Sequence, residues 1–139
     1  MREIVLDTNV LVAALRSKRG ASHQLVQMIG ERRWRLNISV ALALEYEDVL
    51  KRSGMVPGFN ESEVDAFLAF VFANSNLVPS VMGRRPSLRD PDDDRILEVA
   101  VQCRAMIVTH NRRDFAGARP LGVVVRTPAE FLEMLREGK

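Results

Sequence analysis

The 139-residue sequence has few of the residues that cross-link small proteins or build the common zinc sites. It contains one cysteine, Cys103, and two histidines, His23 and His110. One cysteine excludes an intramolecular disulfide, and with two histidines it falls short of the four ligands of a structural zinc site. A chain that needs no disulfide is typical of a reducing compartment, which predicts a cytoplasmic protein.

Long apolar runs are absent as well. No stretch reaches the roughly 18 consecutive apolar residues of a membrane-spanning helix. The first residues, from Met1 to Asp7, become acidic too soon for a signal peptide. With 47% hydrophobic and 27% charged residues the composition is that of an ordinary globular protein. The length predicts a single domain over residues 1–139.

Lysine is scarce, because arginine supplies all but three of the twenty basic residues: Lys18, Lys51 and Lys139. Arginine binds phosphates with two parallel hydrogen bonds and is common in nucleic-acid-binding proteins. A general preference of the source genome for arginine explains the same bias. Eighteen acidic residues leave a net charge of only +2, so the composition alone does not identify a nucleic-acid-binding protein.

The apolar pattern alternates between short strands and amphipathic helices. It predicts strands at residues 4–6, 34–38, 77–81, 105–109 and 122–126. It predicts helices at 10–16, 22–33, 40–52, 61–73, 92–103 and from 128 onward, with Ser39 and Thr127 as caps of the third and last. The expected fold is α/β, a parallel sheet of about five strands flanked by helices on both faces. Ligands bind such sheets beyond the carboxyl ends of the strands.

Glu45 has no evident structural role on its predicted helix. Its neighbours at helical spacing are apolar, and none is a base: Ala41, Leu42 and Val49. An unpaired carboxylate is costly to bury. Either Glu45 is a functional group, or it lies at the edge of the apolar stripe and reaches water.

Asp7 ends the first predicted strand and opens the turn Asp7-Thr8-Asn9. One interpretation is helix capping, for which all three residue types are suitable. The other is ligand binding, since the carboxyl end of a strand is where an open sheet places its ligand.

The run from Asp90 to Asp94 holds more acids than one helix start requires. Asp90 or Asp92 suits the cap, and Asp92 is also spaced to pair with Arg95. Asp94 is expected in solvent. Asp93 is expected on the buried side, because apolar residues follow it at helical spacing: Ile96, Leu97 and Ala100.

Asp114 closes a polar segment that follows the strand at 105–109 and includes Thr109 and Asn111. Its position places it at the carboxyl end of a strand, although an ordinary surface turn explains it equally well.

Converging carboxylates require a cation. Two like charges about 4 Å apart repel by roughly 4 kcal/mol at an effective dielectric constant of 20. Mg²⁺ or Mn²⁺ reverses the sign, because hard cations prefer carboxylate oxygens and water. A phosphoacceptor receiver domain clusters acids in the same way, but it needs a lysine after a late strand. Lysines at 18, 51 and 139 are wrongly placed for that role.

Together, these motifs resemble those of the PIN-domain nucleases, above all the small prokaryotic VapC-like proteins of toxin–antitoxin pairs. The resemblance covers essentially the whole chain. It implies catalytic, metal-binding acids at Asp7, Glu45 and Asp93. The family's fourth acid directly follows the Val-Thr strand end, where this sequence has Asn111, and Asp114 resembles a substitute. Supporting roles are implied for five residues: Thr8, Asn9, Asp90, Thr109 and Asn111.

The implied activity is Mg²⁺- or Mn²⁺-dependent hydrolysis of single-stranded RNA by a metal-activated water. The implied partners are RNA, an antitoxin protein and a second copy of the chain. The basic residues near the acids are candidate RNA contacts: Arg16, Lys18, Arg19, Arg85, Arg89 and Arg112. Since the fourth acid is displaced, a PIN-fold module that binds RNA or protein without cutting is the alternative. The apolar segment at 67–72 is either a fully buried core helix or a dimer or antitoxin surface.

Overall fold

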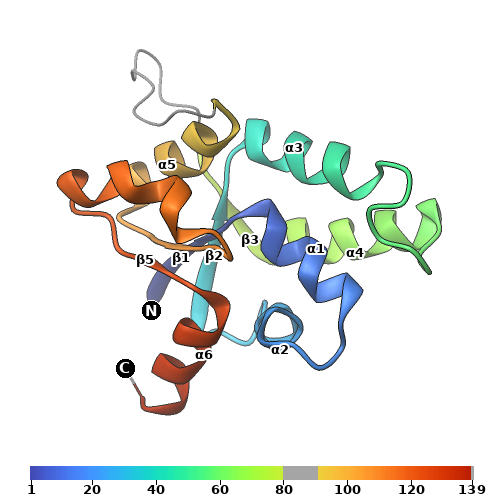
Figure 1. Ribbon diagram of the computed structural model, residues 1–139, viewed down its shortest axis with the longest axis horizontal. Helices are drawn as coiled ribbons and strands as arrows, with labels where there is room; N and C mark the ends of the chain where they lie inside the picture. The colour runs from blue at the N-terminus through green and yellow to red at the C-terminus, as the bar shows by residue number, and fades with distance from the viewer. Residues whose placement is uncertain (80–90, 139) are drawn as a thin grey trace.

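The computed structural model describes residues 1–79 and 91–138, and in that part it contains one five-stranded sheet (Figure 1). Its strands are β1 (Arg2–Leu6), β2 (Trp34–Ile38), β3 (Ser75–Leu77), β4 (Met106–Val108) and β5 (Val125–Arg126). The order is β3-β2-β1-β4-β5, and every neighbouring pair is parallel. The predicted parallel α/β fold is confirmed.

Helices lie on both sides of the sheet (Figure 1). They are α1 (Thr8–Arg16), α2 (Ala21–Gln27), α3 (Val40–Leu50), α4 (Glu61–Ala73), α5 (Pro91–Cys103) and α6 (Pro128–Arg136), with a 3₁₀ segment η1 (Arg112–Leu121). α5 packs against β1, β2 and β4, whereas α2 packs against both α1 and α6. Double coverage explains why the central strand β1 ends in an uninterrupted apolar run, which is fully buried: Ile4, Val5 and Leu6.

None of the helices in the described ranges has the length and apolar character needed to cross a membrane.

Side-chain caps fix the starts of two helices as the sequence predicts. Ser39 Oγ accepts a hydrogen bond from the backbone N–H of Leu42 at 3.1 Å at the start of α3. Thr127 and Glu130 cap each other's backbone N–H at the start of α6, at 3.1 and 2.8 Å. These caps set where α3, which carries Glu45, begins, and they hold Glu130 in place beside η1.

Three elements depart from their predicted bounds by three residues or more at one end. The helix predicted at 22–33 ends at Gln27, and the loop after it contains Gly30 and Arg32 with φ of +90° and +64°. A side chain at Gly30 would also meet Asn74, since a Cβ there would lie 2.7 Å from its Oδ1. The strand predicted at 77–81 lies at Ser75–Leu77, and residues 80 and 81 are outside the described part. The strand predicted at 122–126 is reduced to Val125–Arg126, because Gly122 adopts a left-handed conformation that ends η1.

α4 is not a fully buried core helix, so that interpretation is wrong. It buries one face, through Val64, Leu68 and Val71, and leaves Phe70 41% exposed. The dimer or antitoxin surface stays a prediction.

The strand order creates one switch point, between β1 and β4. From β1 the chain builds outward through β2 and β3 on one side, and through β4 and β5 on the other. The carboxyl ends of β1 and β4 lie side by side, since the N–H of Asp7 donates to the carbonyl of Val108 at 2.9 Å. Asp7 and Thr109 therefore flank the crevice where α/β sheets bind their ligands.

Candidate active site

Asp7 occupies the N-cap position of α1, but its side chain makes no capping hydrogen bond. Its Oδ2 instead accepts hydrogen bonds from Thr109 Oγ1 at 2.7 Å and from Asn9 Nδ2 at 3.1 Å. The residue is only 8% exposed. The backbone N–H groups of Thr8 and Asn9 nevertheless stabilise its ionised form, so Asp7 combines the position of a helix cap with a side chain that points across the switch point.

Burial is the largest influence on the Asp7 carboxyl group and raises its pKa above the ordinary value. The hydrogen bond from Thr109 opposes this shift, and the negative charge of Asp114 adds to it. An ionised group that the fold destabilises at the ligand-binding edge of a sheet is typical of a functional site.

Thr109 connects the polar residues that follow β4 to Asp7. Its Oγ1 accepts a hydrogen bond from the backbone N–H of Asn111 at 3.0 Å while it donates to Asp7. Asn9 joins the same network, because its Oδ1 accepts from the N–H of His110 at 3.2 Å. The predicted supporting residues Asn9, Thr109 and Asn111 thus converge on one point.

Asp114 belongs to this network through Asn111, whose Nδ2 donates to Asp114 Oδ2 at 2.8 Å. It is exposed in the first turn of η1, as a surface turn residue would be. Its charge nevertheless acts on Asp7, which places the two carboxylates in one electrostatic site.

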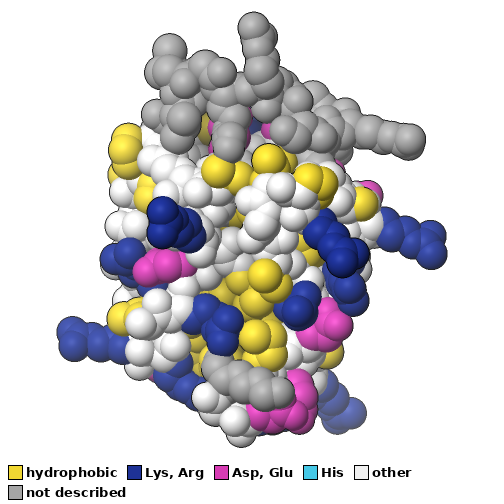
Figure 2. Space-filling view, turned by 90° about the vertical axis from the view of Figure 1, so that its left-hand side faces the viewer, with side chains coloured by type: hydrophobic (Ala, Val, Ile, Leu, Met, Phe, Trp, Pro, Cys, Tyr) yellow, Lys and Arg dark blue, Asp and Glu magenta, His cyan; other side chains and the backbone are white. Residues whose placement is uncertain are grey.

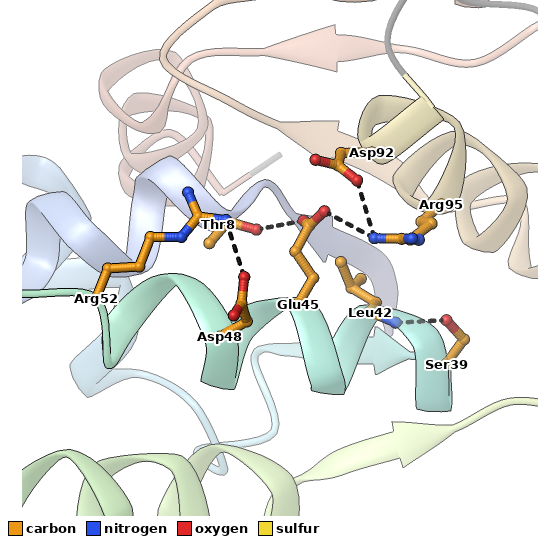
Figure 3. A network of polar contacts seen from close by, with 8 residues as sticks. All are labelled: Thr8, Ser39, Leu42, Glu45, Asp48, Arg52, Asp92 and Arg95. Carbon is orange, nitrogen blue, oxygen red and sulfur yellow. Dashed lines mark hydrogen bonds and ion pairs between the residues drawn. The ribbon is translucent and has the colours of Figure 1, made fainter. Parts of the chain in front are cut away.

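Glu45 projects from α3 toward the start of α1 and toward α5 (Figure 3). Its Oε2 accepts a hydrogen bond from Thr8 Oγ1 at 2.7 Å, and its Oε1 lies 3.4 Å from Arg95 Nη1. The side chain is 8% exposed, so the interpretation that it reaches water is wrong. Arg95 also binds Asp92 at 2.9 Å, as its spacing predicts.

Burial raises the pKa of Glu45, and the hydrogen bond from Thr8 is the main opposing influence. The charges of Asp92 and Asp7 raise the pKa further, while Arg95 lowers it. Asp7 therefore interacts electrostatically with both Glu45 and Asp114, although the three acids come from separate parts of the chain.

The acid run at the start of α5 differs from its prediction. Asp94 is only 6% exposed, so the expectation that it lies in solvent is wrong, while Asp93 is partly exposed. Helical spacing predicts which residues share a face of one helix. It does not predict which other segments of the chain pack against the first turn of that helix. Asp93 shares that turn with Asp92, whose partner Arg95 reaches Glu45. Asp90 lies outside the described residues.

Whether these residues suit a divalent metal ion depends on their donor atoms. Within residues 1–79 and 91–138, no three His, Cys, Asp or Glu side chains are arranged so that they could hold one ion. Mg²⁺, however, usually binds one or two carboxylates and keeps several waters. Asp7, Glu45 and Asp114 offer only oxygen donors, and a cation would offset the buried charge of Asp7. The residues fit a hard dication whose coordination is completed by water.

The predicted RNA-binding residues are dispersed. Arg16, Lys18 and Arg19 are exposed at and beyond the far end of α1, roughly 13 Å along the helix from Asp7. Arg112 pairs with Glu130 at 3.2 Å beside the site. Arg85 and Arg89 lie outside the described residues.

Tyr46 is a supporting residue that the sequence interpretation missed. It is fully buried, and its hydroxyl donates to the carbonyl of Leu6 at 2.5 Å. This bond ties α3 to the last residue of β1, between the two elements that carry Glu45 and Asp7. The available signal was a lone tyrosine next to Glu45 and four residues before Leu50, on the apolar face of α3.

Replacing Thr109 with valine is expected to lower the free energy of unfolding by about 2 kcal/mol, because buried polar partners would lose their hydrogen bonds. The affected groups are the Asp7 carboxylate and the N–H of Asn111. Urea unfolding measures the loss. The control Thr109→Ser keeps the hydroxyl group, and equal stability of the two variants would contradict the assigned role of that hydroxyl.

Comparison with known proteins places this geometry in a family. Residues 3–113 match the family model described as PIN domain. No curated protein sequence is significantly similar to the chain.

Several solved structures share the fold. VapBC2 from Rickettsia felis, bound to a DNA fragment from its promoter, is 14% identical, with 90% of this chain and 98% of that chain covered and a TM-score of 0.65. VapBC-1 from nontypeable Haemophilus influenzae is 15% identical, with 91% and 98% covered and a TM-score of 0.62. FitAcB from Neisseria gonorrhoeae is 17% identical, with 90% and 97% covered and a TM-score of 0.51. At these identities the likeness extends to the fold alone.

Proposed function

Because the chain belongs to the PIN-domain family, we propose that it is a Mg²⁺- or Mn²⁺-dependent ribonuclease that hydrolyses single-stranded RNA. The observation that carries this proposal is Asp7, a buried carboxylate of raised pKa at the switch point of the sheet, with Glu45 and Asp114 within electrostatic reach. Burial destabilises the ionised form of this carboxylate, and a bound cation would offset its charge.

Asp7, Glu45, Asp93 and Asp114 would supply the carboxylates, with one or two of them on each metal ion and water completing its coordination. When bound, the metal supplies activation of water and neutralisation of charge on the phosphodiester. The chain's own polar groups fix the ligands: Thr8 orients Glu45, Thr109 and Asn9 orient Asp7, and Asn111 orients Asp114. Orientation matters because a small displacement of a ligand costs much of the rate.

The biological role within this proposal is that of a toxin in a toxin–antitoxin pair, acting in the cytoplasm as a homodimer. Its support is the fold shared with VapBC proteins and the exposed side of α4 around Phe70.

The deciding experiment is an RNA cleavage assay of Asp93→Asn and Asp94→Asn against the wild type. With Mg²⁺ we expect Asp93→Asn to lower the rate at least about 100-fold, and the matched variant Asp94→Asn to stay within about threefold of the wild type. EDTA should abolish cleavage by every active form.

Equal wild-type cleavage with Mg²⁺ and with EDTA would refute the metal mechanism. Loss of activity in Asp94→Asn alone would mean that Asp94, and not Asp93, is the metal ligand. RNA binding without cleavage under any metal condition would favour the non-catalytic binding module.

A further inference from the structure

η1 and β5 line an open hollow of about 850 Å³ on one face of the molecule. Its floor is apolar and includes the valines at 123–125, of which Val124 is 45% exposed. Its rim carries four arginines: Arg112, Arg113, Arg119 and Arg126. Figure 2 looks onto this side and shows an apolar patch with Lys and Arg side chains on both sides of it and some Asp and Glu side chains nearby. We call it the arginine-rimmed hollow.

The hollow adjoins the candidate active site at two points. Arg112 and Arg113 directly precede Asp114 in η1. Arg126 ends β5, and its carbonyl accepts a hydrogen bond from the N–H of Thr109 at 2.9 Å. A strand of nucleic acid that leaves the site past Asp114 therefore passes over the rim.

The charge of the rim is only partly compensated within the described part of the chain. Arg112 pairs with Glu130, and Arg126 Nη1 donates to the carbonyl of Val125 at 2.9 Å. Arg113 and Arg119 are exposed and form no ion pair with any of residues 1–79 or 91–138, and no acid lines the hollow. Two unneutralised guanidinium groups above an apolar floor complement a ligand that combines phosphates with a flat apolar body.

We propose that the arginine-rimmed hollow binds one unstacked nucleotide of the RNA that enters the candidate site, an inference that rests on the proposed function. The base packs on the valine floor, and the flanking phosphates bind Arg113 and Arg119. Proteins recognise single-stranded RNA through splayed bases stacked on aromatic rings or arginine planes and through phosphates bound to arginine. In this hollow the valines offer the base an apolar contact, and the arginines offer both the phosphate contact and a plane for stacking.

A partner peptide fits the hollow less well. A peptide would bind here by extending the sheet at β5, which is its edge. β5 has only two residues, and the Arg126 side chain already occupies the carbonyl of Val125. The edge therefore offers no ladder of free backbone groups.

Binding is tested by fluorescence anisotropy with a fluorescein-labelled oligouridine, in the Asp7→Asn background so that cleavage does not interfere. We expect Arg113→Ala/Arg119→Ala to raise the Kd about tenfold and to reduce the salt slope by about 1.4, at about 0.7 per lost phosphate contact. The matched control Arg33→Ala/Arg136→Ala removes the same charge near the end of α6 and should stay within about twofold.

The floor is tested with Val124→Ser, a change at a half-exposed position. It should weaken oligouridine binding about threefold and leave binding of an abasic oligonucleotide of equal length unchanged. This readout separates a base pocket from a merely basic surface.

Equal weakening by both arginine pairs, or none by either, would overturn the proposal. So would an acidic peptide whose binding, unlike that of RNA, depends on Arg113 and Arg119, because the hollow would then belong to a protein partner. Failure of the proposed function gives a different result, namely wild-type protein that does not cleave RNA, whatever the two arginine pairs do to RNA binding.

Discussion

Asp7→Asn is expected to lower metal-dependent RNA cleavage about 1000-fold and, at the same time, to stabilise the metal-free protein. The loss follows from removing the charged oxygen that a cation requires. The gain follows from burial, which raises the Asp7 pKa and therefore destabilises the folded state when the group is ionised. Asparagine carries no charge, and its Oδ1 can still accept the hydrogen bond from Thr109.

The expected gain is on the order of 1 kcal/mol, or about 3 °C in Tm for a domain of this size. It depends on pH with a definite sign. Asp7 has a raised folded pKa, so its unfavourable contribution is complete only above that folded pKa. That contribution disappears as the pH falls through the folded pKa toward the ordinary value of 3.8. The difference in Tm between variant and wild type should therefore shrink on acidification.

Thermal melts with EDTA and with Mg²⁺ measure both effects. Mg²⁺ should raise the Tm of the wild type and leave that of Asp7→Asn unchanged, because only a protein that binds the ion gains stability from it. Asp48→Asn is the control, since Asp48 is an exposed acid on α3. A lower Tm for metal-free Asp7→Asn would show that the carboxylate serves the fold instead of a ligand.

The elements that position these acids were predictable where the signal is local. β2 was predicted at its observed bounds, and α3 starts at Ser39, because an apolar run and a capping side chain specify their own neighbourhood. The place of Asp7 was predictable for the same reason, since the sequence reveals the carboxyl end of a buried strand.

The contacts that complete the site were not predictable from the sequence. Thr109 and Asp7 are 102 residues apart, and Arg95 and Glu45 are 50 apart, so no helical or strand period relates them. Only the strand order places β4 beside β1 and α5 beside α3. The expectation that Asp94 lies in solvent was wrong for the same reason. Its burial depends on packing between segments and not on the spacing of residues within α5.

Edge strands were predicted least well. β3 and β5 each pair on one side only and are three and two residues long. Their short apolar stretches carry little periodic signal, and neighbouring loops decide where pairing stops. The arginine-rimmed hollow lies at such an edge. The amino-acid composition shows that arginine is abundant, but it does not show that four arginines lie around one hollow.

Glu45→Gln and Arg95→Ala are expected to have opposite effects on metal binding. Glu45→Gln removes a proposed metal ligand and should lower RNA cleavage about 1000-fold. Arg95 lies 3.4 Å from Glu45 and 2.9 Å from Asp92. It therefore neutralises part of the negative charge that would attract a metal ion. At neutral pH, Arg95→Ala should therefore tighten Mn²⁺ binding by roughly threefold, as expected for a partly exposed pair.

The gain should reverse in acid. Arg95 lowers the pKa of Glu45, so its removal raises that pKa further and lets protons compete with the metal for the carboxylate. Calorimetric Mn²⁺ titration at neutral and acidic pH tests both signs, and Lys51→Ala removes an equal charge just beyond the end of α3 as the control. In the Glu45→Gln background Arg95→Ala should have little effect, since the pair is already broken. If Arg95→Ala tightens Mn²⁺ binding in that background as well, the metal and the Arg95 guanidinium do not compete for Glu45. Arg95 would then act through Asp92 or through the electrostatic potential of the whole site.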